Sequence, residues 1–143
     1  MKQPLIPGRE HTFCYRVPDT KIVPALVPES AEFQRMPRVF ATGFFVGLLE
    51  WTCIQALEGC LDAPAEQTVG THVDVSHCAA TPVGMDVTVK VKLVEVDARR
   101  LVFDVEAHDA LELIGKGRHE RYIIDRARFD EKLARKEQSA GAR

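Results

Sequence analysis

The chain has 143 residues, of which 45% are hydrophobic and 28% are charged, and its formal net charge is −2. This length suits one globular domain with its own core, and the composition excludes a disordered or fibrous chain. The absence of a basic cluster argues against a nucleic-acid partner, and the four cysteines, which lack CxxC spacing, fit a protein of the reducing cytoplasm.

The first third of the chain is predicted to form an edge strand followed by a lid. Residues 1–9 lack the apolar region of a signal peptide. Alternation over Arg9–Val17 ends at a proline, as expected of an edge strand. Prolines punctuate residues 18–37, where Ser30 offers an N-cap to a short helix over 31–35. We interpret residues 18–37 as a lid, although a plain connecting loop fits the same pattern.

A long apolar segment comes next, and a single carboxylate interrupts it. Glu50 is the only charged side chain between Arg38 and Glu58. Glu50, a glutamine and two glycines favour a helix buried by protein over a membrane span, so no membrane association is expected. Thr42 is the expected N-cap, and the helix should end near Gly59. Because burying an unpaired carboxylate costs several kcal/mol, Glu50 is a functional-site candidate.

After the helix, the period of the sequence changes to two, which predicts four strands joined by short hairpin connections. These strands span 68–78, 85–96, 101–109 and 113–124. A charged C-terminal helix with a frayed tail, 126–143, completes the chain, with the helix reaching 137. The outline is one α+β domain, residues 1–143, in which a curved antiparallel sheet of about five strands wraps one long helix. This is the architecture of a hotdog fold.

The first strand of the meander is predicted to carry a histidine on its apolar face. That face comprises alternate residues: Val69, Thr71, Val73, Val75 and His77. The face should pack on the central helix, so His77 would point toward the helix that carries Glu50. A lone inward histidine is more often a hydrogen-bonded core residue, but its coincidence with an isolated glutamate favours a catalytic role, because histidine titrates near neutral pH.

The last strand places two further polar residues on one face, where two glycines alternate with them and allow close approach of a helix or ligand. Arg121 is interpreted either as an anion-binding residue or as an ion-pair partner of Glu120 or Asp104. His119 is interpreted as a packing residue. The histidines lack the spacing of metal ligands, so no metal is expected.

Thr42 precedes Glu50 by eight residues on the predicted helix. Eight residues of helix rise about 12 Å and turn about 80° past two full turns, so the two side chains should not touch. A substrate, a water molecule or a second subunit could join them. The helix N-terminus also offers free N–H groups to an oxygen that gains negative charge.

Five stretches of the sequence match those of a known family. They are Val-Pro-Glu-Ser at 27–30, Val-Phe-Ala-Thr-Gly-Phe at 39–44, Val-Gly-Leu-x-Glu-Trp at 46–51, His-x-Ala-Ala-Thr-Pro at 77–82 and Ile-Gly-x-Gly-x-His-Glu-Arg at 114–121. The chain, over roughly residues 7–135, resembles the bacterial fluoroacetyl-CoA thioesterases, which have the hotdog fold.

The resemblance implies hydrolysis of a short-chain acyl-CoA thioester without a cofactor, since the CoA thioester is itself the substrate. It implies a homodimer in which the first meander strands pair across a two-fold axis and the site lies at the interface. The implied catalytic residues are Thr42, Glu50 and His77. The implied substrate-binding residues are Gly70 and Arg121 near the acyl carbonyl, and Val23, Leu26, Phe33 and Met36 in the lid.

One lid residue departs from the family pattern. Met36 replaces a phenylalanine of the fluoroacetate enzyme, and methionine shapes a pocket less sharply. The acyl preference therefore stays open. Two other functions also stay open: an enoyl-thioester hydratase or dehydratase, and a non-catalytic acyl-CoA-binding dimer in which the polar residues form a satisfied buried network.

Overall fold

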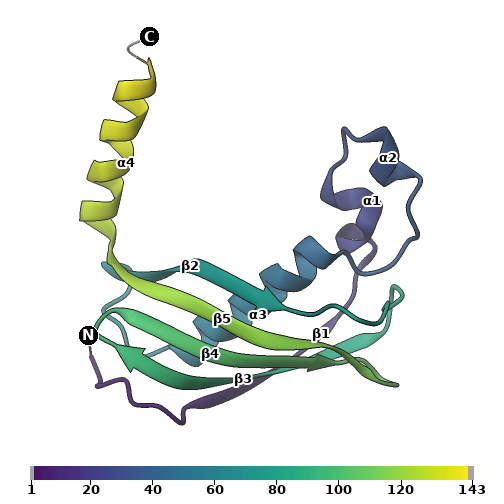
Figure 1. Cartoon of the computed structure of the whole chain (residues 1–143), viewed down its shortest axis with the longest axis horizontal. Coiled ribbons are helices and arrows are strands. Elements are labelled where there is room, and N and C mark those ends of the chain that lie inside the picture. Colours follow the sequence, from purple (N-terminus) through teal and green to yellow (C-terminus); the bar gives the residue numbers. More distant parts are fainter. Residues whose placement is uncertain (1, 142–143) are drawn as a thin grey trace.

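Five antiparallel strands curve around one long helix in the computed structural model, which describes residues 2–141 (Figure 1). The strands are β1 (Glu10–Arg16), β2 (Glu66–Val75), β3 (Asp86–Asp97), β4 (Arg100–His108) and β5 (Leu113–Asp125). Their order in the sheet is β1-β3-β4-β5-β2, so β1 and β2 are the edges among the described strands. The predicted α+β hotdog architecture is confirmed.

The inner face of the sheet forms most of the core. Buried and exposed residues alternate along β3 and β4, as expected of strands with one face in the core and one in water. The inward residues of β3 pack against the helix α3 (Thr42–Ala56), which contributes Phe45, Leu49 and Cys53. Burial of these side chains provides the main driving force for wrapping the sheet around the helix.

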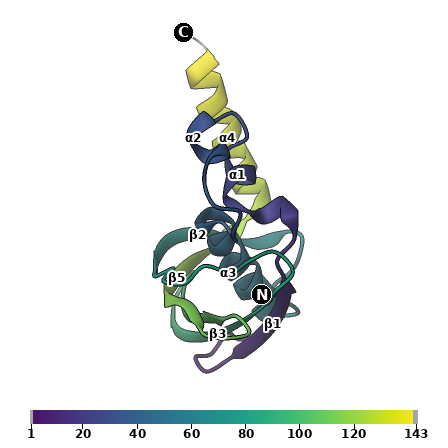
Figure 2. The ribbon, with the colours of Figure 1, turned by 90° about the vertical axis from the view of Figure 1, so that its right-hand side faces the viewer.

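Helix α3 differs from the prediction at its start, and one of its sides is exposed. Its N-cap is Ala41, and Thr42 is the first helical residue, so the Thr42 hydroxyl does not cap the helix. The curved sheet does not close around α3, and Trp51 and Ile54 remain 46% and 47% exposed. The sheet wraps α3 as predicted (Figure 2), and this side of the helix stays exposed in the single chain.

Strand β2 contains a bulge that changes which residues face the helix. Gly70 pairs with Arg121 and His72 pairs with Glu120, so Thr71 is the extra residue of the bulge. An extra residue reverses the alternation, and Gly70 therefore faces α3, whereas the sequence pattern put it on the outer face. The strand also ends at Val75, which leaves His77 in the segment that follows it.

The lid segment lies beside the start of α3 and contains three short helices: η1 (Asp19–Lys21), α1 (Val23–Leu26) and α2 (Ala31–Gln34). The predicted N-cap is confirmed, since the Ser30 hydroxyl accepts a hydrogen bond from the backbone N–H of Phe33 at 3.1 Å. The Gln34 side chain donates to the carbonyl of Pro24 at 2.9 Å and so ties α2 to α1.

The C-terminal helix α4 (Arg126–Gly141) is longer than predicted, and residues 142–143 of the predicted tail lie outside the described residues. Figure 1 shows that α4 and the lid lie at opposite ends of the sheet. Both project in the same direction, past the edge formed by β2 (Figures 1 and 2). No helix within residues 2–141 is long and apolar enough to cross a membrane.

Candidate active site

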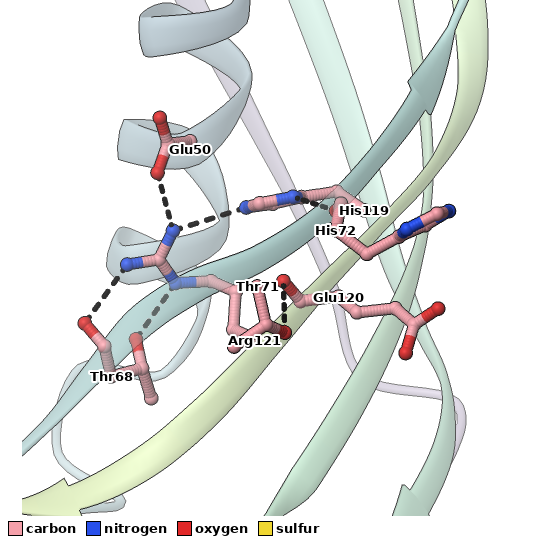
Figure 3. Close-up of polar contacts among 7 residues, drawn as sticks. All are labelled: Glu50, Thr68, Thr71, His72, His119, Glu120 and Arg121. Carbon is pink, nitrogen blue, oxygen red and sulfur yellow. Dashed lines mark hydrogen bonds and ion pairs between the residues drawn. The ribbon is translucent and has the colours of Figure 1, made fainter.

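Glu50 forms an ion pair with a buried arginine of the last strand. Its Oε2 atom accepts a hydrogen bond from Nη1 of Arg121 at 3.0 Å (Figure 3). The arginine side chain is 3% exposed, whereas the glutamate side chain is 38% exposed. Glu50 was singled out because an unpaired buried carboxylate is costly, and here its carboxylate is paired with Arg121 and partly exposed to solvent.

Thr68 at the start of β2 fixes the other side of the guanidinium. Nε of Arg121 donates to the Thr68 hydroxyl at 2.8 Å, and Nη2 donates to the Thr68 carbonyl at 2.9 Å. Because the guanidinium is planar and two of its nitrogens donate to Thr68, it keeps one orientation. Its Nη1 atom therefore points at Glu50 in a fixed direction. Of the two interpretations of Arg121, surface ion pairing is excluded, since Glu120 pairs with Arg100 and Asp104 with Arg118.

Gly70 makes room for this cluster. A Cβ atom at position 70 would lie 2.7 Å from Oε2 of Glu50, 3.2 Å from Cε1 of His119 and 3.4 Å from Nη1 of Arg121. Only glycine lets the backbone of β2 approach these three side chains so closely. The geometry thus places Gly70, predicted as a substrate-binding residue, directly against the carboxylate of Glu50.

Thr42 and His77 form a second polar pair at the N-terminal end of α3. The Thr42 hydroxyl and Nδ1 of His77 are hydrogen-bonded at 2.7 Å, and the imidazole stacks on Phe45 with ring centroids 4.6 Å apart. Nε2 of His77 is buried and has no hydrogen-bond partner within residues 2–141. Burial lowers the pKa of His77, which keeps the imidazole neutral and able to accept a proton near pH 7.

The lid lies beside this second pair, in which Thr42 remains exposed. Leu26 of α1 lies so close to α3 that a Cβ atom on Gly43 would lie 2.8 Å from its Cδ2. Gly43 directly follows Thr42, so the lid contacts the helix beside the Thr42–His77 pair. Phe33 is half-buried in the lid, whereas Met36 is 50% exposed.

The site residues therefore fall into two clusters, and sequence reasoning anticipated only part of this arrangement. The expected Glu50–His77 contact is not formed: His77 bonds to Thr42, and Glu50 bonds to Arg121 about two helical turns away. Thr68 and His119 were not predicted as site residues. The shared face of His119 and Arg121 on the last strand was the signal that could have identified His119.

One buried cysteine lies beside the Glu50 cluster. Cys53 lies near Glu50 and Arg121, but burial raises the pKa of its thiol to about 12, so the thiol is protonated at neutral pH and is a poor nucleophile. Among residues 2–141, no three histidine, cysteine, aspartate or glutamate side chains are grouped to hold a metal ion.

Comparison with known proteins identifies the family. Residues 24–127 match the family model described as fluoroacetyl-CoA-specific thioesterase. The chain belongs to this family. It is 46% identical to the fluoroacetyl-CoA thioesterase of Streptantibioticus cattleyicolor over 136 residues, which cover 95% of this chain and 97% of that protein.

Solved structures agree with this assignment. The crystal structure of a mutant fluoroacetyl-CoA-specific thioesterase is similar with a TM-score of 0.91 at 45% identity, and the match covers 94% of this chain and 99% of that one. A Thermus thermophilus protein of the thioesterase superfamily is similar with a TM-score of 0.86 at 26% identity, over 99% of each chain. Family membership confirms the predicted resemblance and the predicted reaction class, thioester hydrolysis.

Proposed function

We propose that this protein hydrolyses a short-chain acyl-CoA thioester to the free acid and CoA, with the acyl group in the range of acetyl or fluoroacetyl. The observation that carries the proposal is a pair of polar contacts made by helix α3. The Glu50 carboxylate of α3 binds Arg121, and the Thr42 hydroxyl of α3 binds the neutral imidazole of His77. The relatives of known activity include a fluoroacetyl-CoA thioesterase, which supports a small acyl group.

Glu50 is the residue that attacks or activates. Its carboxylate either adds to the thioester carbonyl or removes a proton from the attacking water. When Glu50 adds to the carbonyl, the C–S bond breaks to give CoA thiolate and an acyl anhydride at Glu50, which water then hydrolyses to the free acid. When Glu50 acts as a base, the oxygen of the water adds to the carbonyl and the C–S bond breaks directly. In both routes the proton lost by the water ends on the CoA thiolate, and His77 is the transfer partner. Thr42 orients His77 through their hydrogen bond, and the first N–H groups of α3 and Gly70 stabilise the oxyanion.

A single chain holds the two clusters apart, and a homodimer brings them together. Antiparallel pairing of two copies of β2 sets the beginning of one strand beside the end of the other. With the two-fold axis near Val73, Gly70 of one copy would lie opposite Ser76 of the other, next to the partner's His77. The Glu50 cluster of one subunit would then face the Thr42–His77 cluster of its partner.

Three features support this dimer. Strand β2 is an edge of the described sheet, and its residues from Gly70 to Asp74 are exposed. The exposed side of α3 lies between the two edge strands, where Trp51 contacts Phe13 and Tyr15 of β1. The helix α4 and the lid project past β2 as two arms, and antiparallel pairing would place α4 of one subunit beside the partner's lid (Figure 1). A cytoplasmic location is part of the proposal and rests on the four free cysteines.

The deciding experiment measures thiol release from acetyl-, fluoroacetyl-, malonyl- and phenylacetyl-CoA by the purified protein and by Glu50→Gln. Glutamine keeps an oxygen that can accept from Arg121 but cannot act as a carboxylate. We expect release from at least one small acyl-CoA and its loss in the variant. Full activity in Glu50→Gln, or no release from any substrate, would overturn the proposal.

A further inference from the structure

Beyond the residues that face the substrate, His119 connects the backbone of β2 to the Glu50 carboxylate through Arg121. Its Nδ1 atom lies 2.9 Å from the carbonyl oxygen of His72, and its Nε2 atom lies 3.0 Å from Nη1 of Arg121 (Figure 3). The side chain is almost fully buried, at 1% exposure.

The partners of His119 fix its protonation state. A carbonyl oxygen only accepts hydrogen bonds, so Nδ1 must carry a hydrogen and donate it to His72. A guanidinium only donates, so Nε2 must keep its lone pair and accept from Arg121. A protonated imidazole would present an N–H to the arginine and would repel it. His119 is therefore neutral with its hydrogen on Nδ1.

The environment of His119 favours the same state. Burial and the neighbouring Arg121 charge lower the pKa of His119, while the hydrogen bond to the His72 carbonyl opposes the shift. Burial is the largest of these effects, so the net direction is downward, and the imidazole stays neutral at neutral pH.

Nη1 of Arg121 is thus shared between an imidazole and a carboxylate. The same atom donates to Nε2 of His119 and to Oε2 of Glu50, both at 3.0 Å. Thr68 binds Nε and Nη2, on the opposite side of the guanidinium. His119 is therefore the residue that fixes where Nη1 lies relative to Glu50. Gly70 keeps this position open, because a Cβ there would contact all three side chains.

We infer that His119 is a positioning residue for the thioesterase reaction: as the Nδ1–H tautomer, it accepts from Arg121 and thereby fixes the Glu50 carboxylate against the β2 backbone. The inference rests on the proposed function, since it assigns a role relative to the catalytic carboxylate. It also makes a structural claim, the tautomer of His119, that holds whether or not the substrate is an acyl-CoA.

Two variants separate the two hydrogen bonds of His119. In His119→Gln, the longer side chain places an oxygen near the position of Nε2, so it can still accept from Arg121. In His119→Asn, the shorter side chain places an N–H near the position of Nδ1, so it can donate to His72 but cannot reach Arg121. Each variant removes the ring and keeps one of the two contacts, so the pair forms a matched control.

The inference predicts that Asn lowers kcat by about 10- to 100-fold with KM little changed, because a misplaced catalytic group costs this much, whereas Gln retains kcat within about fivefold. Asparagine is one methylene shorter than glutamine and leaves the larger gap in the core, so His119→Asn should have the lower urea midpoint. A pure packing role predicts that both variants keep kcat when they are assayed well below their urea midpoints. Equal losses, or a greater loss for Gln, would overturn the inference.

An NMR measurement tests the structural claim without relying on activity. The long-range 1H–15N spectrum of the histidines should show His119 at pH 7 as a neutral ring with Nδ1 protonated, in the wild type and in Glu50→Gln. A hydrogen on Nε2, or an imidazolium, would refute the positioning role even in an active enzyme. The expected tautomer in a protein that releases no thiol would instead leave His119 placed as described and refute the proposed reaction.

Discussion

Replacing Gly70 by alanine should disable the site while leaving the fold intact. The added Cβ would lie 2.7 Å from Oε2 of Glu50, and a relaxed carbon–oxygen contact needs about 3.3 Å. The carboxylate oxygen must therefore retreat by about 0.6 Å. If it moves along the bond to Arg121, the present 3.0 Å distance grows to about 3.6 Å, which is too long for a hydrogen bond.

The catalytic and stability effects of Gly70→Ala should differ in size. A displaced carboxylate should lower kcat by about 10- to 100-fold. The weakened ion pair should cost about 1 kcal/mol, because the Glu50 side chain is 38% exposed and water screens it. Alanine also reduces the freedom of the unfolded chain, which offsets about 0.4–1 kcal/mol. The urea midpoint should therefore shift little.

The matched control is Gly47→Ala in helix α3. A Cβ atom at position 47 meets no heavy atom of the described chain within 4 Å, and alanine is the better helix former by about 1 kcal/mol. This variant should keep wild-type kcat and gain stability. Steady-state thiol release and urea denaturation measure both quantities. Wild-type kcat in Gly70→Ala would refute the claim that close approach of β2 positions Glu50.

Three further predictions concern the other cluster, the pH dependence and the lid. Thr42→Val should lower kcat by about tenfold because it removes the hydrogen bond to His77, whereas Thr42→Ser should stay near wild type; equal activity of both would count against that bond. The pKa values of His77 and His119 in the folded protein lie below the usual 6.5, so just below that pH the unfolded chain binds more protons than the folded chain. The unfolding free energy should thus fall on acidification below pH 6.5, by at most about 1.4 kcal/mol per pH unit for each histidine. In denaturation experiments at several pH values, His119→Gln should make this fall less steep. An unchanged slope would refute the lowered pKa of His119. Met36→Phe should change the ratio of kcat/KM for fluoroacetyl-CoA to that for acetyl-CoA by about tenfold, and an unchanged ratio would remove Met36 from the acyl pocket.

The overall fold could be predicted from the sequence because its patterns are local. The change from an apolar run to period-two strands gave one helix and a meander, and the short hairpin connections dictated antiparallel neighbours. The isolated charge of Glu50 also singled out the residue that pairs with the buried Arg121. Each of these signals lies within a few adjacent residues, where propensity and periodicity act directly.

The arrangement of the site could not be predicted in the same way. Period-two alternation assumes an uninterrupted strand, and the bulge at Thr71 breaks this assumption without a distinctive residue to announce it. As a result, the pattern assigned Gly70 to the wrong face. The partner of Glu50 was equally hidden, since Arg121 lies 71 positions away and is brought to α3 only by the curvature of the sheet.

The central claim is that Glu50 of one subunit works with Thr42 and His77 of its partner. Heterodimers carrying two different affinity tags test it in two combinations. A Glu50→Gln chain paired with a His77→Gln chain keeps one intact composite site. A chain with both substitutions paired with a wild-type chain keeps none.

The measurement is thiol release from a short acyl-CoA by the two purified heterodimers. We expect about half of the wild-type activity when the substitutions lie on different chains, because a two-fold dimer has two equivalent sites, and almost none when they lie on the same chain. The reverse result, with activity only when both substitutions share a chain, would show that each subunit contains a complete site and would contradict this account.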